Sequence, residues 1–149
     1  MTTRAKTFAF QTSVKWTADV RGILSTSGRP DIVVSTPPEL RGPDGNWGPE
    51  HLYVASIETC LMFTFLALAR GRQLVVRGYE SQSEGMLEPV EGLHVVSQVT
   101  VRPKIAVGSP EDVETAKALA AIMHDRCFIS NSVESVVVVE PDVYLVPGA

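Results

Sequence analysis

The feature that most constrains the fold is an apolar stretch from Pro49 to Gly71 with no glycine or proline in its interior. Proline suits the first position of a helix, where its missing N–H has no partner. Glu50 follows at once, where the helix dipole favours negative charge, and Gly71 is placed to end the helix. We therefore expect a buried central helix with Cys60 near its middle, housed by the rest of the chain.

Composition indicates a soluble protein of one domain. The chain has 149 residues, of which 44% are hydrophobic and 20% charged, as in ordinary globular proteins large enough to bury a core. Its net charge of −4 argues against nucleic acid or an anionic membrane as the main partner. Glu58 would be costly inside a bilayer, so we expect no membrane span. No secretory leader pattern is seen, which predicts a cytoplasmic location.

Three short strands are expected before the central helix. The segment from Phe8 to Trp16 alternates in period two, which is typical of a strand. Shorter strands are predicted at residues 21–26 and 32–35, separated by the turn signal Ser27-Gly28-Arg29-Pro30. Together they predict an antiparallel meander.

The second half of the chain is expected to add a hairpin, a second helix and terminal strands. The predicted ranges are strand 74–84, polar tip 85–92, strand 93–102, a helix starting at Ser109, and strands 133–139 and 143–146. The order βββ-α-ββ-α-β predicts a single α+β domain over residues 1–149. Its helices should pack on largely antiparallel sheet around the central helix.

The second helix carries the other cysteine. Ser109 and Pro110 are typical of a helix start. An apolar stripe follows at spacings of three and four, formed by Val113, Ala116, Ala120, Met123 and Cys127. Cys127 therefore continues the face by which this helix should pack.

Four interpretations of the two thiols remain open at this point. They could be inert buried cysteines, a common use of this residue. A zinc site would need about four ligands, and the chain offers three histidines without metal-binding spacing: His51, His94 and His124. A Cys/His nucleophile could use His124 beside Cys127, although no orienting motif accompanies it. Finally, a redox pair is possible if the two helices bring the cysteines to disulfide distance.

A reactive cysteine must be a thiolate, so it needs a cation or a hydrogen-bond donor nearby. The central helix has no cation close to Cys60. Arg21, at the start of the second predicted strand, is a candidate. The alternatives also suit solvated charges at helix ends: Arg70, Arg72 and Arg126.

The motifs around the two cysteines resemble those of the OsmC/Ohr family, the osmotically inducible and organic hydroperoxide resistance proteins. Pro49-Glu50 is followed by nine residues and then Cys60, and the second cysteine lies in Cys127-Phe128-Ile129-Ser130-Asn131-Ser132. The resemblance, to an OsmC-like branch, covers essentially the whole chain, including the element order and the Gly/Pro-rich loop before the helix.

This resemblance implies an intertwined homodimer that reduces organic hydroperoxides in oxidative-stress defence, with active sites at the subunit interface. By analogy, Cys60 is the peroxidatic cysteine and Cys127 the resolving one. Glu50 matches the glutamate that holds an arginine against the thiolate, and Arg21 is our best match for that arginine. No cofactor or metal is implied, and an external dithiol or a lipoylated protein is expected to regenerate the enzyme.

The sequence departs from the family pattern at two places. Ile57-Glu58-Thr59 precede Cys60, where small residues are common, and Phe128 stands where proline is frequent. Glu58 could raise the thiol pKa if it pointed at the sulfur, or it could recruit a cation or face the dimer partner. Two rival functions follow: a non-redox relative that binds a hydrophobic ligand at the dimer interface, and cysteine-dependent acyl or thiol transfer.

The spacing within the central helix bears on the dimer. Glu50 and Cys60 are ten residues apart, about 15 Å along a helix, so they cannot touch within one straight helix. Glu50 would have to act through a long arginine or from the other subunit, which makes the dimer a requirement of the mechanism. Of the nearby apolar side chains, Phe65 and Met123 are expected in the core, whereas Met62 and Phe63 could line a path for a hydrocarbon tail.

Overall fold

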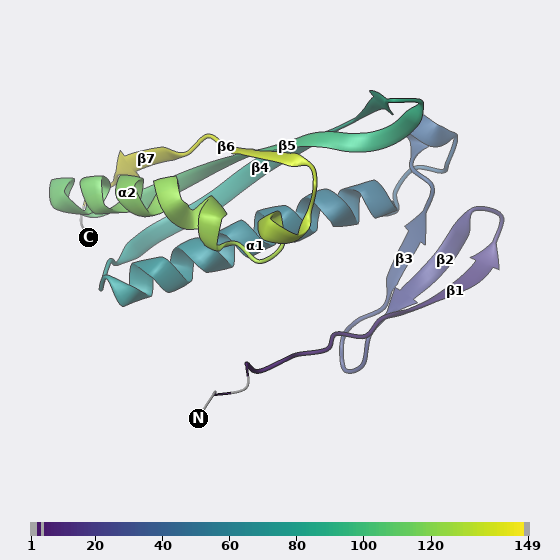
Figure 1. The fold of residues 1–149 in the computed structure, drawn as a ribbon, viewed down its shortest axis with the longest axis horizontal. Helices are drawn as coiled ribbons and strands as arrows, with labels where there is room; N and C mark the ends of the chain where they lie inside the picture. Colours follow the sequence, from purple (N-terminus) through teal and green to yellow (C-terminus); the bar gives the residue numbers. More distant parts are fainter. Residues whose placement is uncertain (1–2, 4, 148–149) are drawn as a thin grey trace. The chain divides into compact units, whose positions relative to one another are not determined.

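The computed structural model describes residues 3 and 5–147 and divides into an N-terminal unit up to His51 and a C-terminal unit from Leu52. Three strands precede a long helix, and a hairpin, a second helix and two terminal strands follow (Figure 1). The predicted α+β class and element order are confirmed. Each unit is described below by itself.

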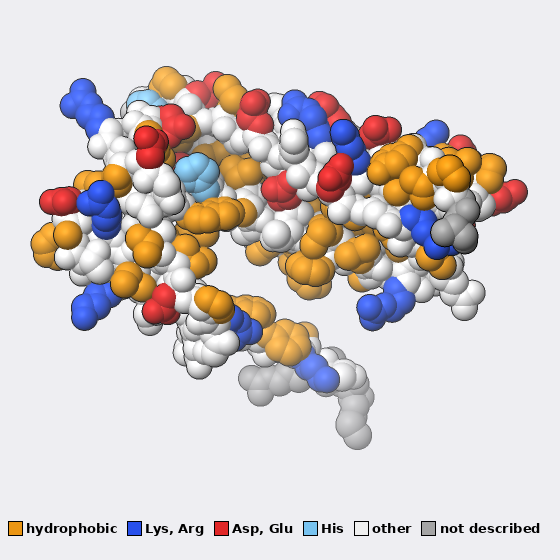
Figure 2. Space-filling view, turned by 180° about the vertical axis from the view of Figure 1, so that it is seen from behind, with side chains coloured by type: hydrophobic (Ala, Val, Ile, Leu, Met, Phe, Trp, Pro, Cys, Tyr) orange, Lys and Arg blue, Asp and Glu red, His pale blue; other side chains and the backbone are white. Residues whose placement is uncertain are grey.

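The N-terminal unit contains an antiparallel meander of β1 (Ser13–Ala18), β2 (Arg21–Ser25) and β3 (Ile32–Ser35). The meander was predicted, but β1 begins at Ser13 rather than at Phe8. Ser13 pairs with Ser25, the last residue of β2, so earlier residues have no partner strand within this sheet. Phe8 and Phe10 are 73% and 94% exposed, and Figure 2 shows hydrophobic and basic side chains along this extended segment beside the grey N-terminal atoms.

Helix α1 (Pro49–Gly71) begins and ends as the sequence predicts. It is buried along one stripe, formed by Ile57, Leu61, Phe65 and Ala69. Its opposite face is open, and Phe63 there is 63% exposed, so the expected burial holds for one face only. By length and composition α1 could also cross a membrane, with a mean hydropathy of 1.8. The core helix of a soluble protein meets the same criterion.

In the C-terminal unit, β4 (Val76–Val90) and β5 (Leu93–Val107) form a long antiparallel hairpin. Its turn is only Glu91-Gly92, both at positive φ, the conformation that suits a two-residue hairpin turn. The polar tip predicted at 85–92 is therefore mostly strand. Gly85 faces α1, and a Cβ there would lie 2.6 Å from Val54 Cγ2, so glycine permits the close approach of helix and strand.

Two terminal strands, β6 (Val136–Val139) and β7 (Asp142–Leu145), pair with β5 in parallel. The prediction of antiparallel sheets is thus wrong at this edge. The reason is that the chain passes through α2 (Pro110–Arg126) after β5. The helix carries it back along the sheet, so that β6 and β7 run in the same direction as β5, as strands joined by a crossover helix do. The Ser109 hydroxyl accepts from the Asp112 amide at 3.2 Å and caps α2, as predicted.

The core of the C-terminal unit lies between the hairpin and the two helices. The α1 stripe packs with Val99, Val101 and Ile105 of β5 and with α2 residues that include Met123. The α2 stripe is buried as predicted, at Ala116, Ala120, Met123 and Cys127. Packing of α1 and α2 into one core brings the two cysteine-bearing helix faces together.

Candidate active site

The two cysteines meet inside the C-terminal unit. Cys60 lies near the middle of α1 and is half-buried, whereas Cys127 is the C-terminal cap of α2 and is fully buried. Both are free thiols, Cys60 packs against the core cluster that contains Cys127, and each thiol shifts the pKa of the other. The two helices therefore place both thiols at one core, and their approach to disulfide distance stays a prediction.

The surroundings of the two thiols shift their pKa values in opposite directions. Burial acts to raise the pKa of Cys60, but the Cys127 side chain, the Ile129 amide, the Thr64 hydroxyl and the Phe128 amide together outweigh it, so the pKa is lowered. Burial and the Cys60 side chain raise the pKa of Cys127, against weaker opposing effects of Ser130. Because the thiolate is the nucleophile, Cys60 is the better attacking group.

Thr64 and Ser130 provide the polar contacts on the two sides. The Thr64 hydroxyl donates its single proton to the Cys60 carbonyl at 2.7 Å and lies 4.0 Å from Cys60 Sγ, so its contact with the sulfur is weak. The Ser130 amide donates to Cys127 Sγ at 3.5 Å. Within the described residues, the buried Ser130 hydroxyl has no partner of normal hydrogen-bond geometry.

Glu58 points away from the thiols and towards β4. Its carboxylate accepts a 2.6 Å hydrogen bond from the Ser81 hydroxyl. Burial and the charge of Glu58 raise the pKa of the neighbouring Tyr79 to about 12. The groups that shift the pKa of Cys60 do not include Glu58, whose carboxylate is bonded to Ser81.

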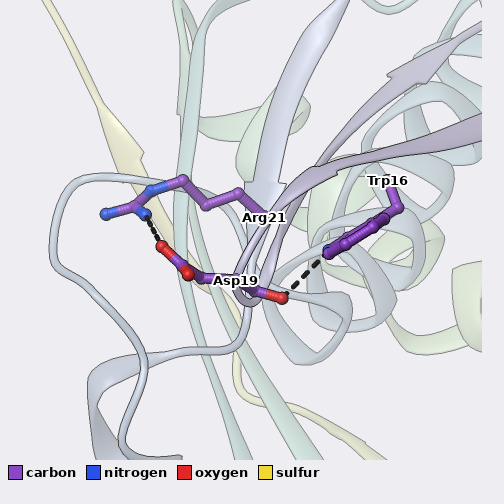
Figure 3. A network of polar contacts seen from close by, with 3 residues as sticks. All are labelled: Trp16, Asp19 and Arg21. Carbon is purple, nitrogen blue, oxygen red and sulfur yellow. Dashed lines mark hydrogen bonds and ion pairs between the residues drawn. The ribbon is translucent and has the colours of Figure 1, made fainter.

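Arg21 lies at the start of β2 and is held by a local network (Figure 3). Its Nη1 contacts Asp19 Oδ2 at 3.4 Å, and Trp16 Nε1 donates to the Asp19 carbonyl at 3.0 Å. The Arg21 side chain is 42% exposed, so this surface ion pair is weak and its guanidinium can exchange partners at low cost.

Glu50 is the other predicted residue in the N-terminal unit. Its Oε2 is buried and has no hydrogen-bond partner among the described residues. It lies beside Gly48, where a Cβ would be 3.1 Å from that oxygen and 3.2 Å from the Ser35 carbonyl. Ser35 pairs with Arg21 across β2 and β3, so both predicted side chains belong to one neighbourhood, although Arg21 contacts Asp19 here.

The alternative site residues are not engaged with either sulfur. Arg70, Arg72 and Arg126 are exposed, and over residues 3 and 5–147 no cluster of His, Cys, Asp and Glu could hold a metal ion. Phe65 and Met123 are fully buried core residues, as expected, whereas Phe63 is open.

A pocket of about 650 Å³ lies elsewhere in the C-terminal unit, and neither cysteine lines it. It is formed by the hairpin end of β5 and the segment before β6, with Tyr53 of α1. The Tyr53 hydroxyl contacts Ser135 Oγ at 2.6 Å, and Ser135 donates to the Val96 carbonyl. Side-chain patterns in the sequence gave no signal for it.

Sequence reasoning also missed the backbone amides after α2. The N–H groups of Phe128 and Ile129, which every residue except proline carries, help to lower the pKa of Cys60. A side-chain motif cannot reveal such donors. The sequence offered only an indirect sign of these donors, which is that the residues after Cys127 are not proline and so keep their N–H groups.

Comparisons with known proteins are consistent with this geometry. A family model described as OsmC-like protein matches residues 42–142. No curated protein matches the chain in sequence. An OsmC-like protein of unknown function from Vibrio cholerae is 24% identical, with a TM-score of 0.84, over 91% of this chain and 99% of that one.

Two other similar structures are described as organic hydroperoxide resistance proteins. The one from Legionella pneumophila is 23% identical, with a TM-score of 0.74 over 93% of this chain and 98% of its own. The one from Elizabethkingia anophelis is 18% identical, with a TM-score of 0.75 over 95% and 99%. These likenesses agree in fold, and the family model covers more than half of the sequence. The chain therefore belongs to the OsmC family.

Proposed function

We propose that this protein is a cysteine-based peroxidase that reduces organic hydroperoxides in oxidative-stress defence. The observation that carries the proposal is a pair of free cysteines at one core, since Cys60 packs against the cluster that contains Cys127 and the pKa values of the two thiols are shifted in opposite directions. A lowered pKa prepares one thiol to attack, and a neighbouring thiol can resolve the oxidised product. Structures described as organic hydroperoxide resistance proteins share the fold.

In the first step, the Cys60 thiolate attacks the terminal oxygen of the hydroperoxide. The O–O bond breaks, an alkoxide leaves and takes a proton to become an alcohol, and Cys60 becomes a sulfenic acid. Cys127 then attacks this sulfur, so that a disulfide forms and water leaves. An external dithiol, either a small molecule or a lipoylated protein, reduces the disulfide by exchange and is itself oxidised.

Arg21 and Glu50 are proposed to complete the thiolate site, as the family resemblance implies. The buried, unpartnered Glu50 oxygen is the kind of group that requires a cation or donor. Arg21 has only an exposed ion pair to give up. Replacing Asp19 by Glu50 as its partner would turn the guanidinium from a surface contact into a catalytic one.

We further propose a cytoplasmic homodimer. The open apolar face of α1 and the ten-residue spacing between Glu50 and Cys60 support this assembly, because a second subunit could cover the face and supply Glu50. A single domain over residues 1–149 and no nucleic-acid or membrane partner belong to the same proposal.

The test is to follow consumption of an alkyl hydroperoxide with a dithiol present. Cys60→Ser should abolish turnover, whereas Cys127→Ser, assayed without the dithiol, should consume one equivalent and stop at the sulfenic acid. Mass spectrometry without reductant should find a Cys60–Cys127 disulfide after one equivalent of peroxide in the wild type. Equal activity of the wild type and Cys60→Ser would reject the proposal and favour the non-redox relative. Covalent labelling of one cysteine by an activated ester, independent of the other, would favour acyl transfer.

A further inference from the structure

Gly48 is the last residue before α1, and close packing rather than backbone conformation explains why it is glycine. It is not among the glycines at positive φ, so its backbone conformation is open to other residues. A Cβ at this position, however, would lie 3.1 Å from Glu50 Oε2, 3.2 Å from Pro37 Cδ and 3.2 Å from the Ser35 carbonyl oxygen. Ordinary van der Waals contacts of a Cβ begin at 3.4 Å. The absent side chain therefore leaves a space, the Glu50 seat, which Ser35 and Pro37 border.

Two of the three groups at the seat are fixed in place. Ser35 is the last residue of β3 and is only 4% exposed, and its amide donates to the Trp47 carbonyl at 3.0 Å. Pro37 is buried, and its carbonyl accepts two backbone amides at 2.9 Å each. The Glu50 carboxylate instead ends a flexible side chain, and its buried Oε2 has no hydrogen-bond partner among the described residues. A Cβ at residue 48 would therefore displace the carboxylate before it displaced either wall.

Gly48 itself is tied to the first turn of α1. Its amide donates to His51 Nδ1 at 2.9 Å. The His51 ring packs edge-on against Trp47, with ring centroids 6.3 Å apart, so the acceptor is held in its turn. Because this bond joins Gly48 to the helical turn that carries Glu50, the seat and the carboxylate keep a constant spacing.

We propose that Gly48 is a positioning residue that acts through Glu50. By carrying no side chain, it lets the Glu50 carboxylate lie against the end of β3. Ser35, which borders the seat, pairs with Arg21 across β2 and β3, so the carboxylate is held beside the strand position from which the guanidinium must reach it. The inference rests on the proposed function where it gives Glu50 and Arg21 a catalytic role.

The seat can be tested by adding the missing Cβ. In Gly48→Ala the displaced Glu50 carboxylate should become more accessible, so a carbodiimide with glycine ethyl ester should label it several-fold faster than in the wild type. Peptide mass spectrometry measures this rate against that of Glu39, an exposed carboxylate of the same unit. Unchanged labelling of Glu50 in a folded Gly48→Ala protein would overturn the seat.

A second variant opens the seat from another wall. Should Gly48→Ala fail to fold, Pro37→Ala removes the Cδ atom but keeps the carbonyl that accepts the two amides. Labelling of Glu50 should again be several-fold faster than in the wild type. The seat is equally rejected if this variant folds and its Glu50 is labelled at the wild-type rate.

The catalytic effect is measured as single-turnover oxidation of Cys60 by an alkyl hydroperoxide. Gly48→Ala should slow this reaction by about tenfold to a hundredfold, the loss expected when a group at the site is misplaced by about 1 Å. Adding Gly48→Ala to Glu50→Gln should slow it no further, because both changes act through one carboxylate. A general structural defect would add to the effect of Glu50→Gln, so additive losses would overturn the positioning role.

Failure of the seat and failure of the proposed peroxidase give different results, because carboxyl labelling requires no peroxide. Faster labelling of Glu50 in Gly48→Ala supports the seat even if hydroperoxide does not oxidise Cys60 of the wild type, a result that counts against the proposed function. Normal oxidation of Cys60 in Gly48→Ala, together with faster labelling of Glu50, overturns the positioning role and supports the function.

Discussion

At the scale of single residues, the interior of the C-terminal unit holds two cysteine thiols and a tyrosine hydroxyl that differ in their hydrogen bonding. The Cys127 sulfur accepts a hydrogen bond from the Ser130 amide, and the Cys60 sulfur lies 4.0 Å from the Thr64 hydroxyl. By contrast, the Tyr79 hydroxyl is buried without a partner among the described residues, and the charge of Glu58 acts on it. A buried hydroxyl without a hydrogen bond destabilises a fold, so Tyr79 should respond to substitution differently from a bonded tyrosine.

The stability of the protein should fall at alkaline pH because of Tyr79. Its pKa is raised from 10 in the unfolded chain to about 12 in the fold, so only the unfolded state loses the proton between these values. The stability is therefore independent of this proton below pH 10 and falls as the pH rises from 10 to 12, by roughly 2–3 kcal/mol. Tyr79→Phe should not show this loss, as measured by urea unfolding at pH 8 and 11.

Tyr53→Phe is the matched control at neutral pH. Tyr53 bonds to Ser135 at 2.6 Å, so its hydroxyl should contribute about 1 kcal/mol, whereas Tyr79→Phe should leave stability unchanged or raise it. A Tyr79→Phe protein that is less stable than Tyr53→Phe at pH 7 would contradict the unpartnered state of Tyr79.

At the scale of elements, the sequence predicted helices better than strands. Local sequence marks the ends of both helices. Each begins with proline, Gly71 ends α1 and Ser109 caps α2. A strand depends on a partner that local sequence does not specify. Phe8–Gln11 alternate well but lie beyond the end of β2, and the parallel pairing of β6 and β7 depends on the path of α2.

The same difference limits prediction of the site. The positions of Cys60 and Cys127 on helical stripes predicted that they could meet, because helical periodicity defines faces. The partners of Arg21 and Glu58 could not be predicted, since Asp19 and Ser81 are ordinary residues reached by long side chains. The amides after Cys127 leave no trace in a side-chain pattern.

The packing of α1 on β4 gives a prediction at this scale. Gly85→Ala should destabilise the fold by roughly 1–3 kcal/mol, because its Cβ would lie 2.6 Å from Val54 Cγ2. Gly78→Ala is the control in the same strand, since its Cβ would meet Ala106 Cβ at an ordinary 3.5 Å. Thermal unfolding should show a lower midpoint for Gly85→Ala only, and adding Val54→Ala should recover part of the loss.

At the scale of the whole molecule, α1 is the element that most needs a partner. Its mean hydropathy reaches 1.8 over a window that is only 22% buried, and Phe63 projects from the open face. Exposed apolar residues such as Phe63, on a helix of this hydropathy, are of the kind found at interaction sites. A second copy of the chain is the occupant that the proposed mechanism requires.

A charge on the open face of α1 should therefore separate the subunits. Phe63→Asp would bury a carboxylate in the proposed interface, which is strongly unfavourable without a partner, so light scattering should give the mass of one chain instead of two. Ala121→Asp adds the same charge to the exposed side of α2 and should leave the dimer intact. Because Glu50 is proposed to act across subunits, the Phe63→Asp monomer should also lose peroxide turnover while Cys60 can still be alkylated. A monomeric wild type with full activity would show that each chain contains a complete site.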